Sequence, residues 1–155
     1  MSKSLNRVKT ALASMGLDHT LHETGEARTA QMAADQVGCQ VDQIGKSILL
    51  SGTQSGKAYL FLTAGGNVVN MDHATQLAQE PLERATPAQV RAQTGFAIGG
   101  VSPIGHITQI PIFMDPRLLE FDEIWVAAGT SHHVFSVCPL KLSQEILAQI
   151  TDFIS

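Results

Sequence analysis

The segment KSILLSGTQSGKAYLFLTAG, residues 46–65, decides the fold class of this sequence. Two apolar runs, 46–52 and 57–65, flank the turn-forming residues TQSG at 53–56. Short apolar runs that are separated by a glycine-containing turn of this length are typical of a β-hairpin. We therefore predict two antiparallel strands that are joined by this turn.

Further strands are predicted on both sides of the hairpin, from short apolar runs that are bounded by turn residues. They cover residues 18–23, 106–115, 123–129 and 133–138, and the last two are expected to pair across the turn GTSH. Because the strands come as hairpins without a regular βαβ alternation, the sheet should be mainly antiparallel.

Helices are predicted where apolar residues recur at spacings of three and four or where capping residues mark an end. The first contains Leu5, Val8, Leu12 and Met15 and stops at Gly16. The others are expected at 29–38, 72–77, 86–95 and 143–154, with first residues Thr29, Asp72, Thr86 and Ser143. The fold class is therefore α+β, a mixed and largely antiparallel sheet or barrel-like core that helices surround, in a single domain over 1–155.

Composition excludes several classes of function. Hydrophobic residues make up 44% and charged residues 15% of the 155 residues, which fits a packed globular core. A net charge of -4 argues against a broad grip on DNA or RNA, but leaves room for binding a short end of a nucleic acid. We expect no membrane span, because no apolar stretch is long enough, and no signal sequence. A reducing cytoplasm is the expected location.

Common catalytic and metal-binding motifs are absent from the sequence. It has no G-x-S-x-G, H-E-x-x-H, Walker loop or G-x-G-x-x-G, and Cys39 and Cys138 form no C-x-x-C pair. His19 and His22 lie three apart in a predicted strand, on opposite faces, and His132 and His133 are expected at the surface where a strand begins. We therefore expect neither a metal ion nor a cofactor.

One loop and one lysine are the informative polar features. AIGGVSPIGH, residues 97–106, places three glycines and a proline in ten positions, as in a loop that another molecule approaches closely. Lys46 precedes the apolar part of the first hairpin strand. From the pattern alone it is a solvated lysine, although a lysine there is also able to direct a compact charge at a phosphate.

Three segments in order resemble the YbaK family, the free-standing relatives of the editing domain inserted in bacterial prolyl-tRNA synthetases. They are GKSILL at 45–50, the Gly99-x-x-x-Pro103 step, and the Ala128-Gly129 turn before HVFSV. The resemblance covers nearly the whole chain. It implies a mixed, largely antiparallel sheet wrapped by helices, and hydrolysis of the ester in a mischarged aminoacyl-tRNA.

The resemblance also implies roles for single residues. The functional lysine of the family falls on Lys46, and the glycine of the last turn falls on Gly129. His132 either lines the amino-acid pocket or faces solvent in that turn. Ser102 is a candidate nucleophile without an identifiable base, so a turn role is favoured.

The glycine loop then supplies the chemistry that the missing motifs do not. Backbone N–H groups at Gly99 and Gly100, in the step that ends at Pro103, would stabilise the charge that develops on the ester carbonyl, and side chains there would block its approach. Val101 and Ser102 would contact the substrate. Lys46 would hold the phosphate of the terminal adenosine, while water or the ribose 2'-hydroxyl attacks or relays a proton.

The expected partner is the acceptor end of an aminoacyl-tRNA, with a synthetase as a possible second partner. The family suggests errors of the proline system, such as alanine or cysteine on proline tRNA. Two other functions stay open: a module that binds an aminoacyl or nucleotide end without cleaving it, and a hydrolase of another small ester or amide.

Overall fold

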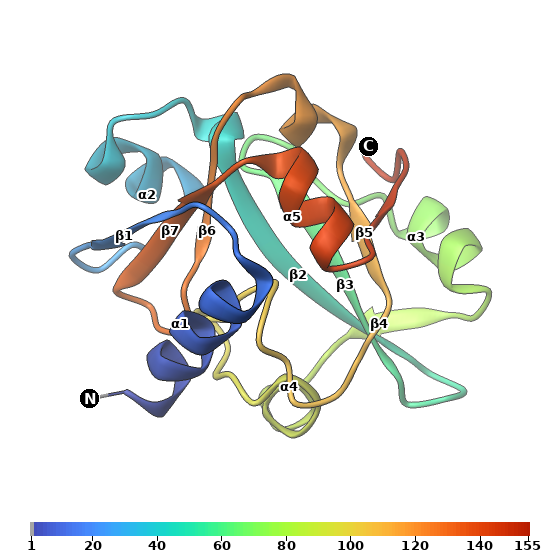
Figure 1. Ribbon diagram of the computed structural model, residues 1–155. Helices are drawn as coiled ribbons and strands as arrows, with labels where there is room; N and C mark the ends of the chain where they lie inside the picture. The colour runs from blue at the N-terminus through green and yellow to red at the C-terminus, as the bar shows by residue number, and fades with distance from the viewer. Residues whose placement is uncertain (1) are drawn as a thin grey trace.

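Residues 2–155 are described by the computed structural model, which contains one sheet with helices packed around it (Figure 1). The sheet has eight strands in the order β1-β7-β6-β2-β3-β5-β8, and β4 pairs with β2 outside this path. The strands are β1 (Thr20–Glu23), β2 (Ile44–Gly52), β3 (Ala58–Ala64), β4 (Leu82–Arg84), β5 (Ile112–Met114), β6 (Ile124–Ala127), β7 (His133–Val137) and β8 (Gln149–Ile150). The helices are α1 (Lys3–Met15), α2 (Ala30–Val37), α3 (Met71–Ala78), α4 (Pro87–Thr94) and α5 (Pro139–Glu145), with short 3-10 helices η1 (Val41–Gln43) and η2 (Pro116–Glu120).

The central hairpin is confirmed. β2 and β3 pair antiparallel along seven residues, with Ile48 opposite Phe61, and every residue of β3 is buried. β6 and β7 also form the expected antiparallel pair, with Val126 opposite Phe135. Parallel contacts of β2 with β6 and of β3 with β5 make the sheet mixed. The prediction of an α+β fold with a largely antiparallel sheet is therefore confirmed.

Local capping explains why three of the predicted helices form. The side chains of Thr29 and Thr86 accept hydrogen bonds from backbone N–H groups in the first turns of α2 and α4. Gly16, Gly38 and Gly95 end α1, α2 and α4 in the left-handed conformation that glycine adopts at little cost. The apolar stripe of α1 faces the main core, which lies against one face of the sheet.

The predicted C-terminal helix over 143–154 is wrong. α5 begins earlier, at Pro139, whose ring presets the helical φ angle, and the Ser143 hydroxyl donates to the Leu140 carbonyl inside the helix. Leu147 has a positive φ of 54°, so the chain leaves the helix and adds β8 to the sheet. Fully buried Phe153 then packs against Phe61, and this tertiary contact outweighs the local helical pattern.

Two other predicted boundaries are wrong. The strand expected over 106–115 is limited to β5, because Pro111 has no N–H to donate and the N–H groups of Ile107 and Thr108 donate to carbonyls of α4 and not to a strand. α3 is capped by Asn70 and not by Asp72, since the Asn70 side chain accepts from the N–H groups of Asp72 and His73. Along residues 2–155, no helix has both the length and the apolar character needed to cross a bilayer.

Candidate active site

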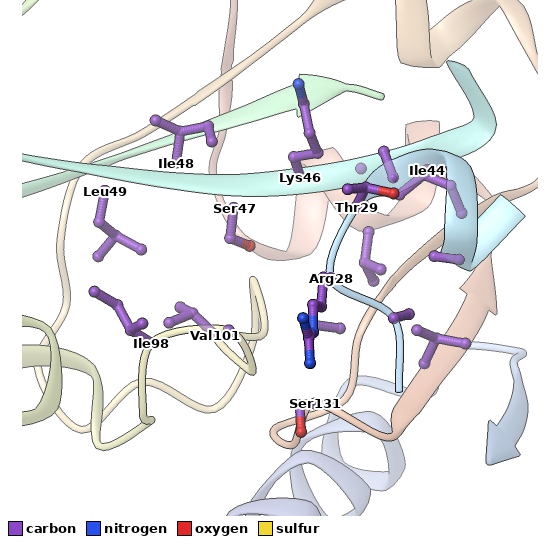
Figure 2. A pocket seen from close by; sticks show the side chains of 18 of the residues that line it. Arg28, Thr29, Ile44, Lys46, Ser47, Ile48, Leu49, Ile98, Val101 and Ser131 are labelled. Atoms are coloured by element: carbon purple, nitrogen blue, oxygen red, sulfur yellow. The ribbon is translucent and has the colours of Figure 1, made fainter. Parts of the chain in front are cut away.

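A cavity of about 520 Å³ lies beside the middle of β2. Its walls come from β2, the first part of the glycine loop, the segment from Thr24 to the start of α2, and the turn between β6 and β7. Figure 2 shows Ser47 and Leu49 leaving β2 on the side of Ile98 and Val101, while Lys46 and Ile48 leave on the other side. The volume is in the range of small-molecule sites.

The cavity coincides with an interruption of the sheet. On the side of β2 away from β3, pairing with β6 ends at Gly45 and pairing with β4 starts at Leu50. Backbone groups of alternate residues point to the same side of a strand. The Leu49 carbonyl accepts from Ala85 N–H on this side, so the N–H and C=O of Ser47 face the same gap, which no strand fills.

Two buried hydroxyls among the lining residues have no hydrogen-bond partner within residues 2–155. They belong to Thr24 and Ser47. Buried polar groups in folded proteins are nearly always paired, so an unpaired one requires a physical explanation. Sequence reasoning missed both residues. Strand alternation was the available signal for Ser47, because it puts residue 47 on the opposite face from Lys46.

The glycine loop is held closed at its two ends. Ile107 N–H donates to the Thr94 carbonyl at 3.2 Å, and Thr108 N–H donates to the Gln93 carbonyl at 3.1 Å. Fully buried Phe96 anchors the loop in the main core. The loop is therefore a fixed part of the cavity wall.

His106 fastens the interior of this loop and was not found from the sequence. Its Nε2 lies 2.6 Å from the Ser102 carbonyl oxygen; because a carbonyl only accepts, Nε2 carries the proton. Burial lowers the pKa of His106, and the hydrogen bond to Ser102 opposes this shift. Arg7 lies 5.4 Å from the centre of the Phe96 ring, against which His106 also packs. The His106 side chain therefore holds the backbone at Ser102.

The structure gives a different reason for glycine at each of the two adjacent loop positions, 99 and 100. Gly99 has a φ of 92°, lines the cavity, and has open space where a side chain would lie. A Cβ atom on Gly100 would lie 2.8 Å from the Cα of Thr130, so Gly100 permits contact between the loop and the β6–β7 turn. Gly100 N–H already donates to the Ala97 carbonyl. The N–H groups of Gly99 and Val101 have no acceptor within the described chain, 2–155.

The remaining predicted loop and turn residues do not line the cavity. Ser102 and Pro103 are buried within the loop. Gly129, with a φ of 96°, packs its backbone against the Ser4 carbonyl at the start of α1. His132 is exposed outside the lining, which instead includes His133.

The ammonium group of Lys46 points away from the cavity side chains. Its Nζ donates to the Asn67 carbonyl at 2.7 Å, and the Asn67 side chain donates to Asp115. Burial lowers the pKa of Lys46, while the carboxylates of Asp42 and Asp115 act in the opposite direction. Lys46 is among the lining residues, but its charge is shared with this polar network.

The lining carries positive charge without a carboxylate. Arg28 and Arg84 belong to it, and no Asp or Glu does. The Arg28 side chain is 75% exposed and pairs with Glu26 at 3.0 Å. Within residues 2–155 no group of three His, Cys, Asp or Glu side chains is arranged to hold a metal ion. The site offers backbone donors, hydroxyls and cations, which suit an ester that carries phosphate.

Comparison with known proteins gives consistent results. A crystal structure described as that of "a putative trans-editing enzyme for prolyl tRNA synthetase" is 42% identical, with a TM-score of 0.90, and the alignment covers 100% of this chain and 99% of that chain. The "Uncharacterized protein YwhH" of Bacillus subtilis is 28% identical over 82% of this chain and 80% of its own length. The "Putative Cys-tRNA(Pro)/Cys-tRNA(Cys) deacylase EbsC" of Enterococcus faecalis is 24% identical over 79% of this chain and 77% of its own length.

Residues 24–144 match the family defined as the aminoacyl-tRNA editing domain. This match includes the cavity, the glycine loop and the β6–β7 turn. It confirms the resemblance found in the sequence and the predicted enzyme class, an aminoacyl-tRNA deacylase. The chain belongs to the aminoacyl-tRNA editing domain family.

Proposed function

We propose that this protein acts in trans on mischarged aminoacyl-tRNA and hydrolyses the ester in the cavity beside β2. Water adds to the ester carbonyl carbon, and the ester oxygen leaves with a proton as a hydroxyl of the terminal adenosine. The products are a free amino acid and an uncharged tRNA. A ribose 2'-hydroxyl is the group available on the substrate to relay the proton.

The observation that carries this proposal is the unpaired backbone at Gly99 and Val101. Their N–H groups have no acceptor within residues 2–155, and both residues line the cavity. Donors that are already fixed in place stabilise the oxyanion of an acyl-transfer transition state without reorganisation. The closed loop ends and His106 supply that fixity. In this proposal, backbone donors stabilise the transition state and no catalytic triad is required.

The lining supports an apolar amino-acid side chain and a phosphate-bearing end. Alanines contribute to the apolar part of the wall, together with Ile, Leu and Val side chains: Ala27, Ala30, Ala33, Ala85 and Ala127. Arg28 and Arg84 supply charge for phosphate at the same lining. We propose alanine or cysteine on proline tRNA as the substrates, with Lys46 contacting the terminal phosphate after its Nζ leaves the Asn67 carbonyl.

Purified protein incubated with a panel of mischarged tRNAs tests the proposal. Release of alanine or cysteine from proline tRNA, with correctly charged prolyl-tRNA left intact, is the expected result. Binding of charged tRNA without release of amino acid would identify a non-catalytic binding module. Hydrolysis of small esters without hydrolysis of any charged tRNA would identify a different hydrolase.

A further inference from the structure

Ser47 presents unpaired polar groups to the cavity from both its side chain and its backbone. Its hydroxyl is buried and has no partner within residues 2–155. Its N–H and C=O face the gap between the end of the β6 pairing at Gly45 and the start of the β4 pairing at Leu50. An exposed strand edge is a ready-made partner for groups of a ligand that donate and accept as a peptide does.

The position of Ser47 relative to the glycine loop limits which part of the substrate reaches it. In Figure 2 the Ser47 side chain leaves β2 toward the cavity side where Ile98 and Val101 lie. In the proposed function, the loop binds the ester carbonyl. In an aminoacyl ester, the α-amino group is attached to the carbon next to that carbonyl. With the carbonyl at the loop, the substituents of that carbon are the groups within reach of β2, and the α-amino group is the hydrogen-bond donor among them that matches the acceptor oxygens of Ser47.

We propose that Ser47 binds the α-amino group of the aminoacyl ester, with its carbonyl and hydroxyl oxygens as hydrogen-bond acceptors. This inference rests on the proposed function and narrows its substrate class to aminoacyl esters whose α-amino group is free. Neutral oxygens make the contact because the lining contains no Asp or Glu. An amino group has more than one N–H and is able to donate to both oxygens of Ser47.

Substrates that differ only at the amino group test the contact. For an alanyl ester, the propionyl ester keeps the carbon skeleton and lacks the amino group, and the N-acetylalanyl ester blocks it. Each is attached to the same tRNA, and kcat/KM is divided by the uncatalysed hydrolysis rate. Loss of two hydrogen bonds should lower this ratio by about tenfold to a hundredfold for the propionyl ester. N-acetylation should lower it at least as much, because the acyl group occupies the strand edge.

Two variants of equal shape test the hydroxyl. Ser47→Val and Ser47→Thr add similar volume, but only threonine keeps the hydroxyl. With the alanyl ester, kcat/KM should fall about tenfold further for Ser47→Val than for Ser47→Thr, and with the propionyl ester the two variants should be equal. Because the hydroxyl has no partner within residues 2–155, its loss should leave the melting temperature of Ser47→Ala at or above that of the wild type.

The outcomes separate the two proposals. If the wild type hydrolyses no charged tRNA, the proposed function fails. If it hydrolyses alanyl and propionyl esters equally, or if Ser47→Val loses the same activity on both, the proposed function stands and the contact at Ser47 is refuted. A melting temperature that falls in Ser47→Ala would show that the hydroxyl stabilises the fold, which also refutes the contact.

Discussion

Two glycine-containing loops near β2 use their backbone groups in opposite ways. At the tip of the β2–β3 hairpin, the Glu80 carboxylate accepts from the N–H groups of Gln54 and Ser55 and from the hydroxyls of Ser55 and Tyr59. In the loop at 97–106, Gly99 and Val101 keep N–H groups without an acceptor in the described chain, 2–155. The polar groups of the hairpin tip are thus paired within the protein, whereas these two N–H groups of the glycine loop are free to bind a ligand or solvent.

The largest effect is expected from placing the same side chain in both loops. Gly99 and Gly56 have φ angles of 92° and 73°, and both have open space where a Cβ would lie. Valine should therefore cost each loop a similar strain, roughly 1–3 kcal/mol. Only Gly99→Val fills the cavity and blocks the approach of the ester carbonyl to the backbone donors, so it should lower deacylation by about a hundredfold or more, as much as the loss of an oxyanion donor does. The deacylation rate and the melting temperature are measured for both variants.

A Gly56→Val protein that loses deacylation while it stays folded would contradict this separation. So would a Gly99→Val protein that stays active, because the carbonyl of the substrate would then lie elsewhere. Equal losses of stability with unequal losses of rate are the result that supports backbone donors at Gly99.

A smaller effect is expected from two lysines of the β2–β3 hairpin, Lys46 in β2 and Lys57 at the turn. Lys46→Ala should lower kcat/KM by about tenfold or more, the effect of losing a charge-assisted hydrogen bond to phosphate. It should also lower the melting temperature, because the Asn67 carbonyl loses its donor. Lys57→Ala, at the exposed end of the hairpin turn, is the control and should change neither quantity. A folded Lys46→Ala protein with wild-type activity would exclude the phosphate role.

The hairpin tip should influence stability in acid and leave deacylation unchanged. Hydrogen bonds from Ser55, followed by those from Tyr59, lower the pKa of Glu80 from 4.5 to about 2. A carboxyl whose pKa is lower in the folded state stabilises the fold above its unfolded pKa, and this contribution is lost as the pH falls from about 4.5 toward 2. Melts of the wild type and Glu80→Gln across this pH range should differ most near neutral pH and converge at low pH. A difference in melting temperature that does not change with pH would show that the pH dependence of stability comes from a group other than Glu80.

Local sequence was sufficient for the parts of the fold that depend on neighbours along the chain. The β2–β3 hairpin and the caps at Thr29 and Thr86 are of this kind. The C-terminal segment was mispredicted because the burial of Phe153 and the pairing of β8 with β5 involve residues distant in sequence. Such tertiary contacts override weak local propensity.

The candidate site likewise contains some residues that the sequence could predict and others that depend on tertiary structure. Gly99 was identifiable from the density of glycines and from the family resemblance. The exposed edge at Ser47 depends on where two distant strands stop, β6 at Gly45 and β4 at Leu50. The role of His106 depends on how the loop closes onto the Ser102 carbonyl. Neither the exposed strand edge at Ser47 nor the contact of His106 with Ser102 can be predicted from a periodic pattern in the sequence.

The smallest effect is expected at Ser102, inside the glycine loop. Its side chain is fully buried, and its hydroxyl accepts only a 3.4 Å hydrogen bond from Ile104 N–H. The carbonyl that His106 holds belongs to the backbone, so Ser102→Ala keeps it. Deacylation should stay within about threefold of the wild type, since a weak hydrogen bond contributes little. Rates are measured with Gly99→Val in the same assay. An inactive but folded Ser102→Ala, beside an active Gly99→Val, would replace the backbone mechanism with a covalent serine route.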